Sequence, residues 1–125
     1  MPRWEQDARA PGPIIQGFSG RGFSIDGIVY EGVLLTPERA EAWEAPAVAE
    51  LEMTSVEPLL ALEPAPEFMI LGTGASMAFP PRALIRELEG RGVGVEVMDS
   101  RAAARTWGML RGEQRWIVAA IMPLG

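Results

Sequence analysis

The sequence predicts a single α/β domain with a mixed β-sheet, the element order β-β-β-α-β-α-β-α-β, and a parallel βαβαβ half at its C-terminal end. Two observations predict this class. An apolar run at 68–71 leads into a glycine-rich loop, and a second run at 93–98 follows an amphipathic segment, which is the pattern of a βαβ unit. The chain has 125 residues, of which 48% are hydrophobic, enough for one core and too few for two.

The first part of the chain predicts an arm followed by short strands. Residues 1–13 are polar and contain several prolines, so we expect a flexible N-terminal arm, with the single α/β domain spanning 14–125. Three apolar segments at 14–18, 22–25 and 28–35 are separated by short glycine-containing turns. We expect them to be three strands that pair antiparallel and so make the sheet mixed.

The middle of the chain predicts less regular structure. Residues 38–49 are acidic and alanine-rich around Trp43, which favours a connection with a helical turn. Two interpretations of Trp43 stay open: it packs on the sheet, or it is an exposed anchor for a partner protein. Ser55 is placed to cap a short helix at 56–62.

The last third of the chain alternates helices and strands. Pro81 suits the first position of a helix whose apolar residues recur at helical spacing, and Ser100 is placed to cap a third helix. We expect the apolar runs at 68–71, 93–98 and 115–122 to be parallel neighbours in one sheet, because a helix of suitable length separates each pair.

Composition excludes many kinds of function. The sequence contains no histidine, cysteine or lysine, so the usual general bases, thiol nucleophiles, P-loop lysines and thiolate metal sites are absent. The net charge of −6 argues against binding to nucleic acid, and no apolar run reaches the length of a membrane span. No signal peptide is visible. We therefore expect a cytoplasmic protein that has no cofactor and is not an enzyme.

The glycine-rich loop is the sharpest local motif. Gly72, Thr73, Gly74 and Ser76 follow a predicted parallel strand, where backbone N–H groups and hydroxyls can hold an anion or a polar ligand. As a dinucleotide fingerprint the motif is weak, because Met77 replaces the third glycine. The alternative is that the glycines only permit a tight turn.

A second polar cluster follows the next parallel strand. Asp99 and Ser100 end that strand and Arg105 begins the helix after it, so all three are expected at the same sheet edge as the loop. The alternative is structural, with Ser100 as a cap and Asp99 paired with Arg105. The candidate ligand-binding residues are Gly72, Thr73, Gly74, Ser76, Asp99, Ser100 and Arg105.

A partner protein would need an exposed apolar surface. The strongest candidates from the sequence are Trp43, in its acidic connection, and Phe18 and Phe23 around the first hairpin. If Trp43 is instead a core residue, the arginine-rich side of the helix after Pro81 is the next candidate. A homo-oligomer is a further possibility.

About residues 14–124 resemble one known family, in segments that include 22–25, 32–35, 66–74, 92–99 and 119–124. The most specific blocks are Leu-Gly-Thr-Gly and Gly-Val-Glu-Val-Met-Asp. This family includes the mitochondrial complex I assembly factor 3 and uncharacterised bacterial and archaeal proteins. The resemblance implies a three-layer α/β domain. For the mitochondrial branch it implies a chaperone-like partner in assembly of a respiratory complex, and for bacterial members it implies no established activity.

Two functional hypotheses follow. The first is a non-enzymatic protein-interaction domain that resembles an assembly factor, with a possible link to the biogenesis of membrane respiratory complexes. The alternative is a module that binds, or weakly transforms, a small polar or anionic ligand at the Gly72–Gly74 loop and Asp99.

Overall fold

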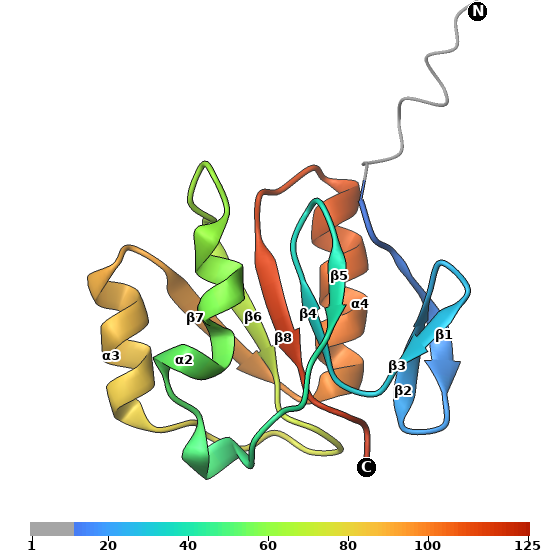
Figure 1. Cartoon of the computed structure of the whole chain (residues 1–125), viewed down its shortest axis with the longest axis horizontal. Helices are drawn as coiled ribbons and strands as arrows, with labels where there is room; N and C mark the ends of the chain where they lie inside the picture. Colours follow the sequence, from blue (N-terminus) through green and yellow to red (C-terminus); the bar gives the residue numbers. More distant parts are fainter. Residues whose placement is uncertain (1–11) are drawn as a thin grey trace, which may run out of the picture.

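A five-stranded mixed sheet forms the centre of the computed structural model, which describes residues 12–125 (Figure 1). Its strand order is β5-β4-β8-β6-β7. Strand β6 runs parallel to β7 and β8, whereas β4 runs antiparallel to β8 and β5. The predicted parallel half and the mixed sheet are therefore confirmed. The strands are β4 (Val33–Leu35), β5 (Ala40–Ala42), β6 (Phe68–Gly72), β7 (Gly94–Met98) and β8 (Val118–Ile121).

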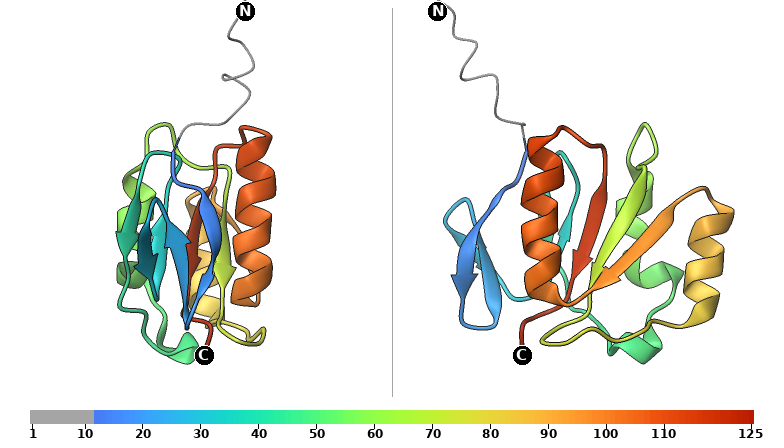
Figure 2. Two further views of the ribbon diagram at one scale, coloured as in Figure 1. Left: turned by 90° about the vertical axis from the view of Figure 1, so that its right-hand side faces the viewer. Right: turned by 180° about the vertical axis from the view of Figure 1, so that it is seen from behind.

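The first three strands form a separate antiparallel sheet instead of extending the main one. Its order is β1-β2-β3, with β1 at Ile15–Ser19, β2 at Gly22–Ile25 and β3 at Ile28–Tyr30. Figure 2 shows this small sheet beside the main one. Residues 1–11, most of the expected arm, lie outside the described residues. Pro13, which we assigned to that arm, is buried, and its carbonyl accepts a hydrogen bond from the Trp107 indole at 3.1 Å.

The single strand expected at 28–35 is wrong, because the chain divides it into β3 and β4, one in each sheet. The break occurs at Gly32, whose carbonyl accepts a hydrogen bond from the Trp43 N–H at 2.9 Å. A Cβ added at Gly32 would lie 2.4 Å from the Trp43 carbonyl oxygen, so only glycine fits where the two segments meet. Five strands therefore precede the first helix, instead of the expected three.

Two helices and a group of short turns cover the two faces of the main sheet, giving three layers. Helix α3 (Arg82–Gly90) and the turns pack on one face, and α4 (Ser100–Gly112) packs on the other (Figures 1 and 2). Because strand side chains alternate between faces, Met69 and Leu71 of β6 join the first core, while Ile70 joins the second.

The segment between β5 and β6 differs from the expected helix at 56–62. It consists of a 3₁₀ turn η1 (Val48–Glu50), one α-helical turn α2 (Met53–Val56) and a second 3₁₀ turn η2 (Glu57–Ala61). Ser55 is not the cap residue: Glu52 occupies that position, and its N–H donates to Ser55 Oγ at 3.1 Å. Earlier in the chain, part of the expected helical connection is the edge strand β5.

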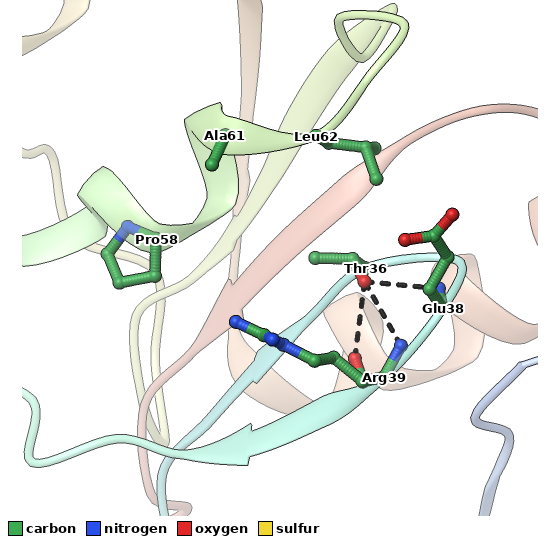
Figure 3. Close-up of a pocket in the computed structure, with 6 residues that line it drawn as sticks. All are labelled: Thr36, Glu38, Arg39, Pro58, Ala61 and Leu62. Atoms are coloured by element: carbon green, nitrogen blue, oxygen red, sulfur yellow. Dashed lines mark hydrogen bonds between the residues drawn. The ribbon is translucent and has the colours of Figure 1, made fainter.

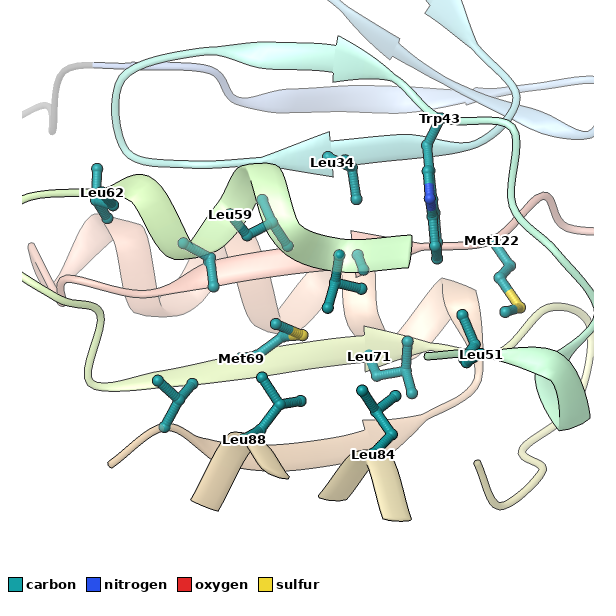
Figure 4. Packing of buried hydrophobic residues seen from close by; sticks show 14 residues of the cluster. Leu34, Trp43, Leu51, Leu59, Leu62, Met69, Leu71, Leu84, Leu88 and Met122 are labelled. Atoms are coloured by element: carbon teal, nitrogen blue, oxygen red, sulfur yellow. The ribbon is translucent and has the colours of Figure 1, made fainter. Parts of the chain in front are cut away.

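Trp43 belongs to the core, so its interpretation as an exposed anchor is wrong. Its side chain is 9% exposed and points into the cluster between Leu34 and Met122 (Figure 4). The indole N–H donates to the Ser55 carbonyl at 3.0 Å, which satisfies the only polar atom of the ring. Trp43 thus links α2 to the sheet, by this hydrogen bond and by its packing in the core.

Candidate functional site

The glycine-rich loop leads from the end of β6 towards α3, as the sequence predicts. Gly72 is the last residue of β6 and is buried, and its carbonyl accepts a hydrogen bond from the Met122 N–H at 2.9 Å. Gly74 has φ = +106°, a conformation that side-chain-bearing residues rarely adopt. The loop therefore needs glycine at position 74 for its shape.

The polar groups of this loop bind one another and the neighbouring strands. The Thr73 hydroxyl donates to the Ser76 carbonyl at 2.8 Å and accepts from the Ala78 N–H at 3.0 Å. Because Thr73 is buried and donates its hydroxyl proton within the loop, it has no donor left for a ligand. Ser76 itself is exposed.

Ser100 connects three segments from inside the protein. The Gly74 N–H donates to Ser100 Oγ at 2.8 Å, and the Ser100 hydroxyl donates to the Met122 carbonyl at 2.7 Å. The Ser100 N–H also donates to the Gly74 carbonyl at 2.8 Å. Ser100 is fully buried, so it cannot reach a ligand in solution. The N–H group of Gly74, the centre of the expected anion nest, is thus already occupied.

Asp99, not Ser100, caps helix α4, so the expected cap is wrong. The Asp99 carboxylate accepts from the Ala102 N–H at 2.9 Å, and Ser100 is the first helical residue. Arg105 forms no ion pair with Asp99; it lines a groove beside β1, together with Ile15 and its neighbours. The structure brings together Gly72–Gly74, Ser76, Asp99 and Ser100, and leaves Arg105 apart. This geometry favours the turn interpretation of the loop.

The same loop exposes two large apolar side chains that the sequence analysis did not assign to a site. Phe79 is 79% exposed and Met77 is 47% exposed. The signal was present in the sequence, since both residues stand between the polar turn and Pro80-Pro81, outside any predicted helix or strand face. The loop is thus held by internal hydrogen bonds and presents apolar groups to solvent.

The two phenylalanines proposed as partner contacts have different surroundings. Phe23 is fully buried in the core, so its expected role at a partner surface is wrong. Phe18 is 42% exposed and stacks edge-on against Phe23, with ring centroids 5.9 Å apart. The Arg101 guanidinium lies 4.8 Å from the Phe18 ring centroid. Phe18 thus remains a candidate contact.

A small pocket lies between the β4–β5 turn and η2, and we do not assign a ligand-binding site to it (Figure 3). Its volume is about 130 Å³, below the size of ordinary ligand pockets. The Thr36 hydroxyl inside it accepts from the N–H groups of Glu38 and Arg39, both at 3.1 Å, which shapes the turn. Arg39 also pairs with Glu41 at 3.5 Å.

Among the described residues, the carboxyl whose pKa is shifted belongs to an ion pair at the start of β6. Glu67 and Arg115 form an ion pair at 2.8 Å, and the hydrogen bond from Arg115 lowers the pKa of the Glu67 carboxyl. This pair joins the start of β6 to the segment before β8. Within residues 12–125, no group of three acidic, histidine or cysteine side chains is arranged to hold a metal ion. Nor does that part of the chain contain a helix long and apolar enough to cross a membrane.

Comparison with known proteins identifies relatives over almost the whole chain. The model of the family described as "Protein of unknown function (DUF498/DUF598)" matches residues 15–122. A Danio rerio protein named NADH dehydrogenase [ubiquinone] 1 alpha subcomplex assembly factor 3 is 32% identical over 94% of this chain and 68% of its own length. An uncharacterised protein of Rhodobacter capsulatus is also 32% identical, over 88% of this chain and 84% of its own.

Solved structures share the fold. The solution structure of a Bordetella pertussis protein, described as a Mth938-like domain, has a TM-score of 0.76 and 25% identity, covering 90% of this chain and 87% of that one. The match to the animal relatives is partial, since this chain spans only 60% of the assembly factor of Bos taurus. The resemblance seen in the sequence and the α/β class are both confirmed.

Proposed function

The chain belongs to the DUF498/DUF598 family, and we propose that it is a non-enzymatic docking domain that resembles an assembly factor and binds another protein through its β6–α3 loop. Relatives named as complex I assembly factors support a role in protein assembly. The proposal extends this role to the biogenesis of a membrane respiratory complex. The cytoplasmic location expected from the sequence stays a prediction.

One observation carries the proposal: the loop uses its polar groups internally and exposes its apolar ones. Phe79 and Met77 are large apolar side chains that are 79% and 47% exposed, and phenylalanine and methionine are enriched at protein interfaces. The hydrogen bonds of Thr73 hold the loop in one shape before binding. A preformed loop loses little conformational entropy when a partner binds.

Charge near the loop suggests what the partner surface offers. Arg82 and Arg86, on the exposed side of α3, follow Phe79 closely in sequence and form no ion pair within residues 12–125. A partner with an apolar pocket and an acidic rim would match both features, because opposite charges at a rim steer association.

The chemistry of the chain supports a non-catalytic role. It has no histidine or cysteine, and the buried Thr73 and Ser100 hydroxyls are engaged in structural hydrogen bonds. Binding of a small ligand at the Gly72–Asp99 edge is the weaker alternative, because the Gly74 N–H already donates to Ser100 and one Asp99 oxygen already caps α4.

Affinity purification of the tagged chain from its own host tests the proposal. The substitution Phe79→Ser removes the exposed ring, and we expect loss of the partner by about thirtyfold, the change for a hot-spot residue of roughly 2 kcal/mol. The matched control is Ile28→Ser, at another exposed apolar side chain, and it should retain the partner. Retention by Phe79→Ser would contradict the proposal. So would a bound small molecule, seen by native mass spectrometry, that Gly74→Val removes.

A further inference from the structure

A groove of about 400 Å³ separates strand β1 from helix α4 and has no function in the proposal above. Figure 2 shows the two elements side by side, with β1 at the edge of the small sheet. Its lining includes Gly17 and Phe18 from β1, and Arg105, Gly108 and Met109 from α4. The groove thus has one wall from a strand and one from a helix.

Strand β1, which forms one side of the groove, has one edge that pairs with no other strand. β1 pairs only with β2, in the order β1-β2-β3, so its outer edge lies on the side without a neighbouring strand. Within residues 12–125, no backbone hydrogen bond outside the sheet involves residues 15–19. An edge of this kind is a template for an added strand.

The groove offers room for a peptide backbone and apolar contacts for its side chains. A Cβ added at Gly17 or at Gly108 would meet no atom within 4 Å, so both walls are open at these positions. Met109 is 61% exposed, and together with Phe18 it gives the groove apolar sides. An extended segment can therefore approach closely and cover apolar surface that now faces water.

One charge in the groove lacks a counterpart. Arg105 is exposed, and no carboxylate within residues 12–125 forms an ion pair with it. Arg105 is the only arginine among the residues that line the groove, so it sets the charge there. A carboxylate on the occupant would complement it.

We propose that the β1–α4 groove binds an extended segment of a partner protein, which adds as a strand to β1 and pairs a carboxylate with Arg105. This inference rests on the proposed docking function and adds a second contact to it. A matching strand has about five residues, since β1 itself has five. A second copy of this chain fits less well, because its β1 segment, Ile-Gln-Gly-Phe-Ser, carries no carboxylate.

The test is an NMR titration of the ¹⁵N-labelled full chain with a capped peptide, Thr-Val-Glu-Val-Glu-Val-Thr. We expect amide shifts at residues 15–19 and 104–109. The matched peptide with glutamine in place of both glutamates should bind about two- to fivefold more weakly, the range for an exposed ion pair. In the variant Arg105→Gln, the two peptides should bind equally. An unchanged preference for the acidic peptide would contradict the role of Arg105.

A second variant tests the groove itself. Gly108→Leu places a side chain at a position where an added Cβ meets no atom within 4 Å, so we expect the fold to persist while the peptide shifts disappear. Shifts that persist in Gly108→Leu would overturn the proposal. So would a dimer of the wild type that Gly108→Leu dissociates, because the occupant would then be a second copy. Phe79→Ser should leave peptide binding unchanged, which separates this test from that of the β6–α3 loop.

Discussion

Replacement of Ser100 by alanine tests whether the glycine-rich loop is a structural joint. In the wild type the Ser100 side chain accepts from the Gly74 N–H at 2.8 Å and donates to the Met122 carbonyl at 2.7 Å. Ser100→Ala leaves both groups without this partner, and a buried group left unpaired costs about 1–3 kcal/mol. The Met122 carbonyl belongs to a buried residue, whereas Gly74 is only half-buried and water can reach it.

The expected loss is therefore about 2–4 kcal/mol in the free energy of unfolding, or roughly 8–16 °C in Tm for a domain of this size. Urea denaturation followed by tryptophan fluorescence measures it, with a shifted midpoint and an unchanged slope. Ser76→Ala is the control: its side chain is exposed and only its carbonyl is used, so we expect a change within about 0.5 kcal/mol. A loss below about 0.5 kcal/mol in Ser100→Ala would refute the structural interpretation.

Three further predictions follow from packing and charge. Trp43→Ala should lower the unfolding free energy by about 3–5 kcal/mol in denaturant titration, because it empties a core position; a near-neutral result would contradict its burial. Gly108→Ala should raise the unfolding free energy by up to about 1 kcal/mol in thermal unfolding, because alanine favours a helix interior more than glycine and an added Cβ there meets no atom. Any destabilisation would contradict the absence of a neighbour at this position. Arg115→Gln should raise the Glu67 carboxyl pKa in an NMR titration. The ion pair lowers the pKa of Glu67 in the folded state. Its contribution to the unfolding free energy is therefore present at pH values above the pKa of Glu67 in the unfolded chain, and it is lost as the pH falls through the pKa of Glu67 in the folded protein. An unchanged pKa would show that the pair does not form.

The parallel core was predictable because its signal is local. Residues 68–71 and 118–121 are almost wholly buried, so their sequences are continuous apolar runs. The division of 28–35 between two sheets was not predictable. It depends on the approach of Gly32 to the Trp43 backbone, and no feature within 28–35 indicates a contact with that later residue.

The candidate site shows the same contrast. The sequence offered a tight turn as one interpretation of the glycines, and the positive φ of Gly74 fits that interpretation. The hydrogen bonds of the Ser100 side chain cannot be predicted from the sequence, because their partners, Gly74 and Met122, lie 26 and 22 residues away in the chain. The missed feature was the exposure of Phe79, which its position in a loop before Pro80 indicated and which the folded arrangement shows.

Site-specific photocrosslinking in the source cells tests the central claim most directly. A benzophenone amino acid placed at position 79 should crosslink to a defined partner protein, because the account makes Phe79 the anchor of the docking surface. The same group at position 28, another exposed apolar position, should give no such product. Equal crosslinking at both positions, or none at position 79, would contradict the account.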